Sequence, residues 1–302
     1  MEQRDTESEN TSVCSEEISC SSCESAETCD AQTQQQHTQE ELARRLSLIR
    51  RRIAVMSGKG GVGKSTLAVN LGVALADSGR RVGILDGDIH GPDVPKMLGL
   101  DGSLPVAGPG GLLPLTGPEG VLVMSMAFLL TNEDTPVAWR GPLKHSLFQQ
   151  FLADVNWGDL DYLIVDLPPG TGDEALSVGQ LIGQPLATII VTTPQDVALL
   201  DARKSVVFAQ SLGMQVIGIV ENMSGLTCPH CGEQINLFKT GGGEKAAKDL
   251  GVPFLGSVPI DPLAVTGGDA GRPIVALAPE SVMAQAMCDL AKRIDSLPEN
   301  PA

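Results

Sequence analysis

The sequence has few aromatic residues and an excess of negative charge. Aromatic side chains make up 3% of the 302 residues, whereas glycine and proline number 34 and 20. This composition suits a packed α/β enzyme with many tight loops and does not suit an aromatic-rich binding module. The formal net charge of −16 opposes binding to nucleic acid or to an anionic membrane, because both surfaces are negative. We therefore expect no nucleic-acid partner.

Long apolar runs are also missing. No stretch approaches the roughly 20 apolar residues that a membrane-spanning helix needs. The first ten residues, MEQRDTESEN, are acidic and polar, unlike a secretory signal. We expect a cytoplasmic protein without a membrane partner. Thiols stay reduced in that compartment, so grouped cysteines are expected to bind metal before they form disulfides.

The N-terminal part of the chain differs from the rest. Residues 1–40 are rich in Ser, Glu, Gln and Thr, and they have too few large apolar side chains to fold alone. They form a predicted extension that contains four of the seven cysteines. Leu42, Leu46 and Ile49 then recur at helical spacing. That spacing predicts a linker helix over residues 41–51.

The remainder of the chain alternates short strands with helix-compatible stretches. Strand candidates are near-continuous runs of Val, Ile and Leu, such as VGILDGD and ATIIVTT. Such runs indicate a parallel sheet that is covered on both faces. The alternation predicts a doubly wound, mostly parallel α/β domain over residues 52–296. Residues 297–302 are expected to form a short tail.

A glycine-rich segment, SGKGGVGKST, follows the first predicted strand of this domain and precedes a helix. In that context the pattern G-x-x-x-x-G-K-S predicts a P-loop, whose backbone N–H groups surround nucleotide phosphates. Lys64 is expected to neutralise phosphate charge and Ser65 to bind Mg²⁺. The alternative is a glycine-rich turn without a ligand. The loop residues predicted to bind nucleotide are Gly58, Lys59, Gly60, Gly61, Val62, Gly63, Lys64, Ser65 and Thr66.

Acidic residues follow two other predicted strands. Asp86 and Asp88 lie in ILDGDIHGPD, and Asp166 lies in LIVDLPPGTGD. Carboxylates after parallel strands lie at the edge where α/β folds bind ligands. We expect Asp166 to hold Mg²⁺ through water. For Asp86 and Asp88 the alternative is that one of them only caps the following turn.

A second lysine, Lys59, makes the loop K-G-G-x-G-K-S, which resembles the deviant Walker A motif of the MinD/ParA/nitrogenase iron-protein group of ATPases. The resemblance implies a nucleotide-dependent homodimer in which Lys59 reaches the partner's nucleotide. It also implies that Asp88 orients the attacking water and that Asn222 contacts adenine. The alternatives are a solvated lysine and a turn-forming asparagine. The guanine-specific sequence N-K-x-D is absent, so ATP is the expected nucleotide.

Two cysteines, Cys228 and Cys231, form a C-P-H-C pair. A tetrahedral zinc ion or an iron–sulfur cluster usually takes four protein ligands. Two chains related by a two-fold axis would together supply four thiolates. The residues alone leave open a bridging [4Fe–4S] cluster and a bridging zinc ion.

Five motifs occur in the order found in the Mrp/ApbC iron–sulfur cluster carrier ATPases. They are GKGGVGKST, DGDIHGPDVPKMLG, DYLIVDLPPGTGDE, ENMSGLTCPHCGE and LGSVPIDP. This resemblance covers roughly residues 50–295. It implies a homodimer, or a heterodimer with a paralogue, that binds a labile [4Fe–4S] cluster through Cys228 and Cys231. ATP binding and slow hydrolysis would gate transfer of that cluster to apo-proteins.

The cysteines of the extension, Cys14, Cys20, Cys23 and Cys29, resemble those of the cytosolic assembly scaffold with a second, N-terminal [4Fe–4S] cluster. The last three have the spacing C-x₂-C-x₅-C. Cys14 would be the fourth ligand. The spacing between Cys14 and Cys20 is shorter than the spacing between the first two cysteines of that scaffold. A zinc site and an unliganded tail are the alternatives.

Other functions fit parts of the pattern. A positioning ATPase of the MinD/ParA type needs a membrane helix or a basic DNA-binding face, and neither is evident. An electron donor like nitrogenase iron protein brings two widely separated cysteines per chain, unlike the close pair here. A zinc-bridged ATPase switch would use the same cysteines without a cluster.

Overall fold

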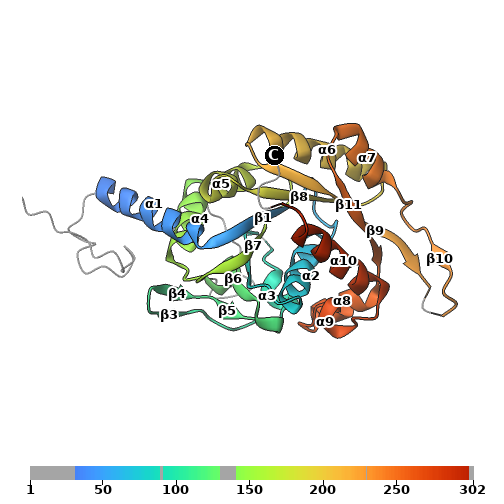
Figure 1. Ribbon diagram of the computed structural model, residues 1–302, viewed down its shortest axis with the longest axis horizontal. Helices are drawn as coiled ribbons and strands as arrows, with labels where there is room; N and C mark the ends of the chain where they lie inside the picture. The colour runs from blue at the N-terminus through green and yellow to red at the C-terminus, as the bar shows by residue number, and fades with distance from the viewer. Residues whose placement is uncertain (1–30, 89–90, 130–140, 229, 299–302) are drawn as a thin grey trace, which may run out of the picture.

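The computed structural model of the protein describes residues 31–88, 91–129, 141–228 and 230–298. A mostly parallel sheet forms its centre, and helices cover both faces of that sheet (Figure 1). The doubly wound α/β fold predicted from the alternating pattern is therefore confirmed. None of the helices in the described ranges is long and apolar enough to cross a membrane.

The main sheet has nine strands, and a separate hairpin adds two more. The main-sheet strands are β1 (Ile49–Ser57), β2 (Val82–Asp86), β5 (Leu115–Thr116), β6 (Leu122–Ser125), β7 (Leu160–Asp166), β8 (Ala187–Thr192), β9 (Gln215–Thr227), β10 (Gln234–Ile235) and β11 (Phe254–Ile260). The hairpin consists of β3 (Val106–Gly108) and β4 (Gly111–Leu113).

The strand order brings three carboxyl ends together. The order is β10-β9-β8-β1-β7-β2-β6-β5, with β11 beside β9. β1 is parallel to β7 and β8, and β2 is parallel to β7 and β6. Only the short strands β5 and β10 run antiparallel to their neighbours in this sheet, within the described residues. Because parallel strands end at the same edge, β1, β2 and β7 present their last residues to one site.

The helices are α1 (Ala31–Ser47), α2 (Lys64–Asp77), α3 (Val94–Met97), α4 (Gly141–Asp154), α5 (Asp173–Ile182), α6 (Asp196–Ser211), α7 (Gly242–Leu250), α8 (Pro262–Asp269), α9 (Ile274–Leu277) and α10 (Val282–Asp295). Two 3₁₀ turns, η2 (Pro118–Gly120) and η3 (Met126–Leu129), flank β6. α2 and α10 pack together on one face of the sheet, and α6 and α7 lie on the other (Figure 1).

The linker helix predicted over 41–51 was wrong at both ends. α1 begins ten residues earlier, inside the predicted extension, and β1 already begins at Ile49. The helix reaches back because alanine, glutamine and glutamate favour helical backbone. Leu42 and Leu46 are buried, and α1 packs against α4. Residues 31–47 therefore belong to the folded body, while the rest of the extension lies outside the described residues.

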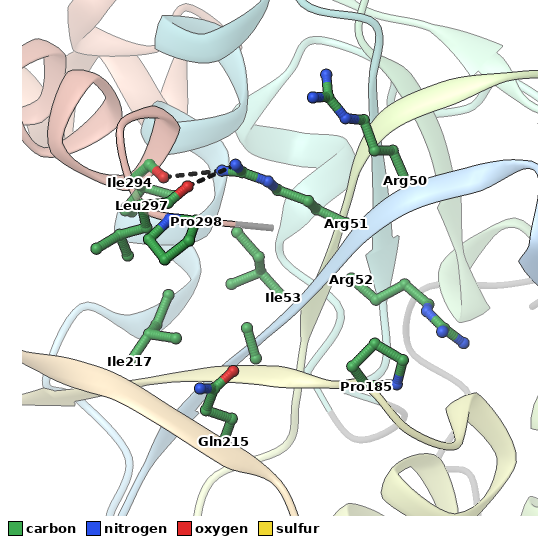
Figure 2. Close-up of a pocket in the computed structure, with 11 residues that line it drawn as sticks. Arg50, Arg51, Arg52, Ile53, Pro185, Gln215, Ile217, Ile294, Leu297 and Pro298 are labelled. Carbon is green, nitrogen blue, oxygen red and sulfur yellow. Dashed lines mark hydrogen bonds between the residues drawn. The ribbon is translucent and has the colours of Figure 1, made fainter. Parts of the chain in front are cut away.

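Three consecutive arginines, Arg50–Arg52, lie in β1 instead of in a helix. Figure 2 shows that their guanidinium groups diverge. Arg51 donates to the carbonyl oxygen of Leu297 at 2.6 Å, just beyond α10, and Arg52 donates to that of Ile182 at 2.7 Å, the last residue of α5. Cations at helix C-termini satisfy terminal carbonyl groups and complement the helix dipole. Arg51 and Arg52 thus anchor two helices and do not converge on an anion.

Candidate nucleotide and cysteine sites

The P-loop connects β1 to α2 in a shape that needs glycine. Gly61 and Gly63 have φ values of 77° and 81°, in the left-handed region that side-chain-bearing residues avoid. Gly58 touches the backbone of Asp201 in α6, where a Cβ atom would collide. No side chain of the described residues caps the N-terminus of α2. The first N–H groups of this helix are therefore available to an anion.

Lys64 and Asp166 form a buried ion pair at this helix end. The distance between Lys64 Nζ and Asp166 Oδ1 is 2.7 Å, and both side chains are almost inaccessible to solvent. Lys64 Nζ also lies 3.3 Å from Ser65 Oγ. Asp166 is the last residue of β7, so the sheet order explains why residues 102 positions apart meet here.

The second oxygen of Asp166 has no partner. Oδ2 is buried and forms no hydrogen bond with any described residue. Burial raises the pKa of this carboxyl, and the neighbouring Lys64 opposes that rise. A buried acceptor that lacks a donor is rare in proteins. Together with the Ser65 hydroxyl, this oxygen fits the oxygen-only ligand set and bound waters that Mg²⁺ prefers.

Asp86 is fully buried at the end of β2. It accepts hydrogen bonds from Ser125 Oγ at 2.9 Å and from the backbone N–H of Asp88 at 3.2 Å. Burial, with the nearby charge of Asp166, raises the pKa of Asp86 to about 8. This carboxyl is therefore protonated at neutral pH, and it holds the turn that carries Asp88. Capping of the turn, one of the alternatives left open by the sequence, matches the contacts of Asp86.

The two lysines of the loop have different surroundings. Lys59 is half-buried and forms no ion pair within the described ranges, in contrast to Lys64. Its carbonyl oxygen accepts a hydrogen bond from Ser57 Oγ at 2.9 Å, which fixes the backbone but leaves the ammonium group unused. Lys59 therefore retains a charge that its own chain does not neutralise among the described residues.

A cavity of about 600 Å³ opens beside the P-loop. Its volume is within the usual range for a small-molecule site. Asn222 of β9 lines it and donates from Nδ2 to the carbonyl oxygen of Val62 at 2.8 Å. Other lining residues include Gly63, Thr66, Lys96, Met97, Met223, Leu237, Phe238, Asp261, Ala264 and Val265. P-loop, β9 and α8 thus meet around one pocket next to the predicted phosphate position.

The cysteine pair forms a tight turn at the end of β9. β9 continues four residues beyond Met223, to Thr227, so Cys228 follows the strand directly. The added length comes from pairing with β10 and with β11, which sequence patterns did not indicate. Within the turn, the N–H of Gly232 donates to the carbonyl oxygen of Cys228 at 2.9 Å.

The turn favours a thiolate at Cys228. Hydrogen bonds from the backbone N–H groups of His230 and Cys231, and from the Cys231 side chain, lower the pKa of Cys228. Thiolates are the form of cysteine that binds metal. Cys231 is exposed and Cys228 is half-buried. No group of three or more metal-binding side chains occurs in the part of the chain that the structure describes, so this turn offers two ligands.

The other cysteines do not join this pair. Cys14, Cys20, Cys23 and Cys29 lie outside the described residues. Cys288 is half-buried in α10, and burial raises its pKa.

The structure thus arranges the predicted residues in two groups. Lys64, Ser65, Asp88, Asp166 and Asn222 surround the P-loop, whereas the cysteine turn lies farther along β9, beyond the sheet (Figure 1). Sequence reasoning missed two buried polar residues near these groups, Ser125 and Glu221. Glu221 ends the apolar run VIGIV, and a carboxylate inside a buried strand is unusual enough to have been noticed.

Comparison with known proteins gives consistent matches over the folded region. A ParA-type family model described as NUBPL iron-transfer P-loop NTPase matches residues 48–295. An iron-sulfur cluster carrier protein from Methanocaldococcus jannaschii is 49% identical over 259 residues, which cover 85% of this chain and 89% of that protein. The rat cytosolic Fe-S cluster assembly factor NUBP2 is 46% identical over 253 residues, 82% of this chain and 93% of that protein.

A solved structure is also similar. It is the nucleotide-binding protein from Archaeoglobus fulgidus in complex with ADP, with a TM-score of 0.70 and 41% sequence identity. The match covers 78% of this chain and 91% of that one.

Proposed function

The chain belongs to the NUBPL-type iron-transfer P-loop NTPases, and on that premise we propose that it is an ATP-dependent iron–sulfur cluster carrier. It binds a labile [4Fe–4S] cluster between two chains and transfers it to apo-proteins. One observation carries this proposal. β9 lines the nucleotide pocket at Asn222 and leads directly into the turn of Cys228 and Cys231. A single strand therefore connects a nucleotide site to half of a cluster site.

ATP would bind with its phosphates on the P-loop N–H groups and its base in the adjoining cavity. Lys64, now paired with Asp166, would turn to the β- and γ-phosphates, whose negative charge replaces that of the carboxylate. The residues that would hold Mg²⁺ are Ser65 directly and Asp166 through water. When bound, Mg²⁺ would neutralise charge on the phosphate oxygens.

Asp88 and Lys59 would act in hydrolysis. Asp88, fixed by Asp86, would orient the water that attacks the γ-phosphate. Lys59 would stabilise the developing charge on the nucleotide of the partner chain, which suits its unused ammonium group. Asn222 would contact the adenine. Gly58, Gly60, Gly61, Val62, Gly63 and Thr66 would complete the nucleotide site.

The cluster is the cargo in this mechanism. Cys228 and Cys231 from each of two chains would supply four thiolates to one [4Fe–4S] cluster. Exposure of the turn suits a cluster that must leave again. The second chain would be another copy or a paralogue, and clients would be apo iron–sulfur proteins. A second cluster on Cys14, Cys20, Cys23 and Cys29 is part of the proposal. The cytosolic relative supports a cytoplasmic location.

Metal analysis after anaerobic reconstitution tests this function. We expect about two irons per chain at the bridging site, because one four-iron cluster is shared by two chains. The double variant Cys228→Ala/Cys231→Ala should lose those irons, as measured by iron, sulfide and zinc content and by Mössbauer spectra. Cys288→Ala is the matched control and should keep them. Iron that remains in the double variant would belong to the N-terminal cysteines.

The main rival is a zinc-bridged ATPase switch that uses the same turn. Zinc that excess iron and sulfide do not displace would favour this rival and refute the carrier function. A positioning ATPase of the MinD/ParA type would bind neither metal at Cys228 and Cys231.

A further inference from the structure

Glu221 is a buried carboxylate that has been given no role in the nucleotide site or in the cysteine turn. Its side chain is completely inaccessible to solvent, in β9 between Thr192 of β8 and Ser257 of β11. No basic side chain of the described residues forms an ion pair with it. Burial of a charge is costly unless hydrogen bonds compensate for the lost water. The partners of this carboxylate therefore show what it holds in place.

Three donors surround Glu221, and they come from both ends of one segment. Oε1 accepts from Ser224 Oγ at 2.6 Å and from the N–H of Gly241 at 2.9 Å. Oε2 accepts from the N–H of Gly243 at 2.5 Å. Residues 225–240, which we name the cysteine excursion, comprise the last residues of β9, the cysteine turn, β10 and the segment that leads back to Gly241 at the start of α7. One carboxylate thus fastens the two ends of the excursion that carries Cys228 and Cys231.

The sequence GGG at 241–243 fits this arrangement. Gly241, the residue before α7, has a φ of 81° and no side chain of its own to cap the helix, so Glu221 accepts the N–H groups there. A Cβ atom on Gly243 would lie 2.9 Å from Glu221 Cβ, closer than real contacts allow. The carboxylate also lies at the positive end of the α7 dipole, which favours its charge. The three glycines therefore let the Glu221 carboxylate approach the start of α7 closely. Hydrogen bonds and the helix dipole stabilise it in that position.

Asn222, the residue after Glu221, lines the nucleotide pocket. Successive strand side chains point to opposite faces, and Asn222 donates to the carbonyl oxygen of Val62 in the P-loop. Directly after it, Met223 has a φ of 59°, a left-handed conformation that costs free energy in a residue with a long side chain. Between the P-loop contact and the Ser224 contact the strand is therefore bent. A shift of Asn222 on nucleotide binding would move Glu221 and its three donors together.

We propose that Glu221 is a positioning residue that couples occupation of the nucleotide pocket to the conformation of the cysteine excursion. The proposal rests on the proposed function for its purpose, since nucleotide would then control how firmly the cluster ligands are held. Its physical content is independent of any cluster. The P-loop and the excursion respond to each other through Asn222 and Glu221, and coupling of this kind acts equally in both directions.

Hydrogen exchange of the full chain, free and with Mg-ADP, tests the coupling without iron. In the wild type, Mg-ADP should slow exchange in residues 225–240 as well as in the P-loop. Glu221→Gln cannot accept both backbone N–H groups, because its amide NH₂ is only a donor. In this variant we expect about tenfold faster exchange of the excursion, the cost of one charged hydrogen bond. Mg-ADP should then protect the P-loop alone.

Controls separate coupling from a general loss of structure. Glu244→Gln removes an exposed carboxylate from the first turn of the same helix and should keep the wild-type response. Ser224→Ala removes one of the three donors and should reduce the response only in part, which keeps the test decisive if Glu221→Gln does not fold. The coupling would be refuted if Mg-ADP did not slow hydrogen exchange of residues 225–240 in the wild type. It would also be refuted if Mg-ADP still slowed that exchange in Glu221→Gln.

Cluster transfer supplies the second readout. The ratio of transfer rates to an apo-acceptor with and without ATP should fall to about one in Glu221→Gln, while bound iron and ADP affinity stay within about twofold of wild type. If wild type holds no iron at Cys228 and Cys231, the carrier function fails, but the exchange experiment still decides the coupling. An unchanged transfer ratio in Glu221→Gln would refute the role of Glu221 and leave the carrier function intact.

Discussion

The P-loop region and the cysteine turn represent opposite ways of preparing a binding site. Around the P-loop, ionisable side chains are buried and already have partners: Lys64 forms an ion pair with Asp166, and Asp86 accepts a hydrogen bond from Ser125. Around the cysteine turn, residues 230–240 are exposed, and the two thiols form half of a ligand set. A ligand at the first site exchanges one charge partner for another. A ligand at the second site needs a second chain and remains near solvent.

This difference concerns stability as well as binding. The paired groups of the P-loop region contribute to folding before any nucleotide arrives, so substitutions there should destabilise the empty protein. The cysteine turn contributes little to the core, so substitutions there should change metal binding alone. The free energy of unfolding of the nucleotide-free protein therefore measures the contrast.

Lys64→Ala should have the largest effect. It leaves Asp166 buried without its counter-charge, which costs about 3–5 kcal/mol of unfolding free energy. Urea denaturation would measure this loss, and calorimetric titration should detect no ADP binding. Lys59→Ala is the matched control, with a change of less than about 0.5 kcal/mol. Equal stability of the two variants would contradict the contrast between the lysines.

Asp86→Asn should change the pH dependence of stability. The folded pKa of Asp86, about 8, exceeds the ordinary aspartate value of 3.8, so between these values the folded state holds a proton that the unfolded state has lost. Wild-type stability therefore falls as pH rises through this window, and the fall ends above pH 8. The variant lacks this loss and should gain about 2.7 kcal/mol relative to wild type between pH 5 and pH 7, at about 1.36 kcal/mol per pH unit. A pH-independent difference in thermal melting would refute the protonated carboxyl.

Gly243→Ala tests the attachment of the excursion to the body. The added Cβ atom would push against Glu221 and lengthen its hydrogen bonds, at a cost of about 1–2 kcal/mol. ADP affinity should stay within about twofold of wild type, as expected for Glu221→Gln, because Gly243 does not line the nucleotide cavity. Denaturation and ADP titration together check this expectation. An unchanged free energy of unfolding would mean that the start of α7 can move without cost, and that its hydrogen bonds to Glu221 contribute little to stability.

Cys228→Ser and Cys231→Ser should have the smallest effect on folding. Both thiols are at least partly exposed, and the serine hydroxyl can accept the same N–H groups of the turn. We expect unfolding free energies within about 0.5 kcal/mol of wild type for the metal-free protein. Urea denaturation of metal-free samples measures this. A loss of more than 1 kcal/mol would place the turn among the structural elements and remove the contrast.

Local patterns located the P-loop but not the partners of its residues. The loop at Gly58–Thr66 could be predicted because phosphate cradles depend on consecutive residues. The partnership of Lys64 with Asp166 follows from strand order, which single strands do not encode. The full length of β9 does not follow from its own residues, since the last of them pair with β10 and β11, which lie farther along the sequence.

The start of the folded body was misjudged for a related reason. Arg50 and Arg51 fall within the predicted linker helix, yet they lie in β1. In the strand, the guanidinium groups of Arg51 and Arg52 reach the ends of two different helices, and these hydrogen bonds favour the strand conformation. That gain depends on α5 and α10, which no local window contains.

The sequence by itself determined the fold class, the position of the P-loop and the close spacing of the cysteine pair, because each depends on neighbouring residues. Only the tertiary structure decided which charges are paired, that burial raises the pKa of Asp86, and that Glu221 fastens both ends of the cysteine excursion. Burial causes this division. Once water is excluded, the partners of a polar group come from whichever segments the fold brings into contact.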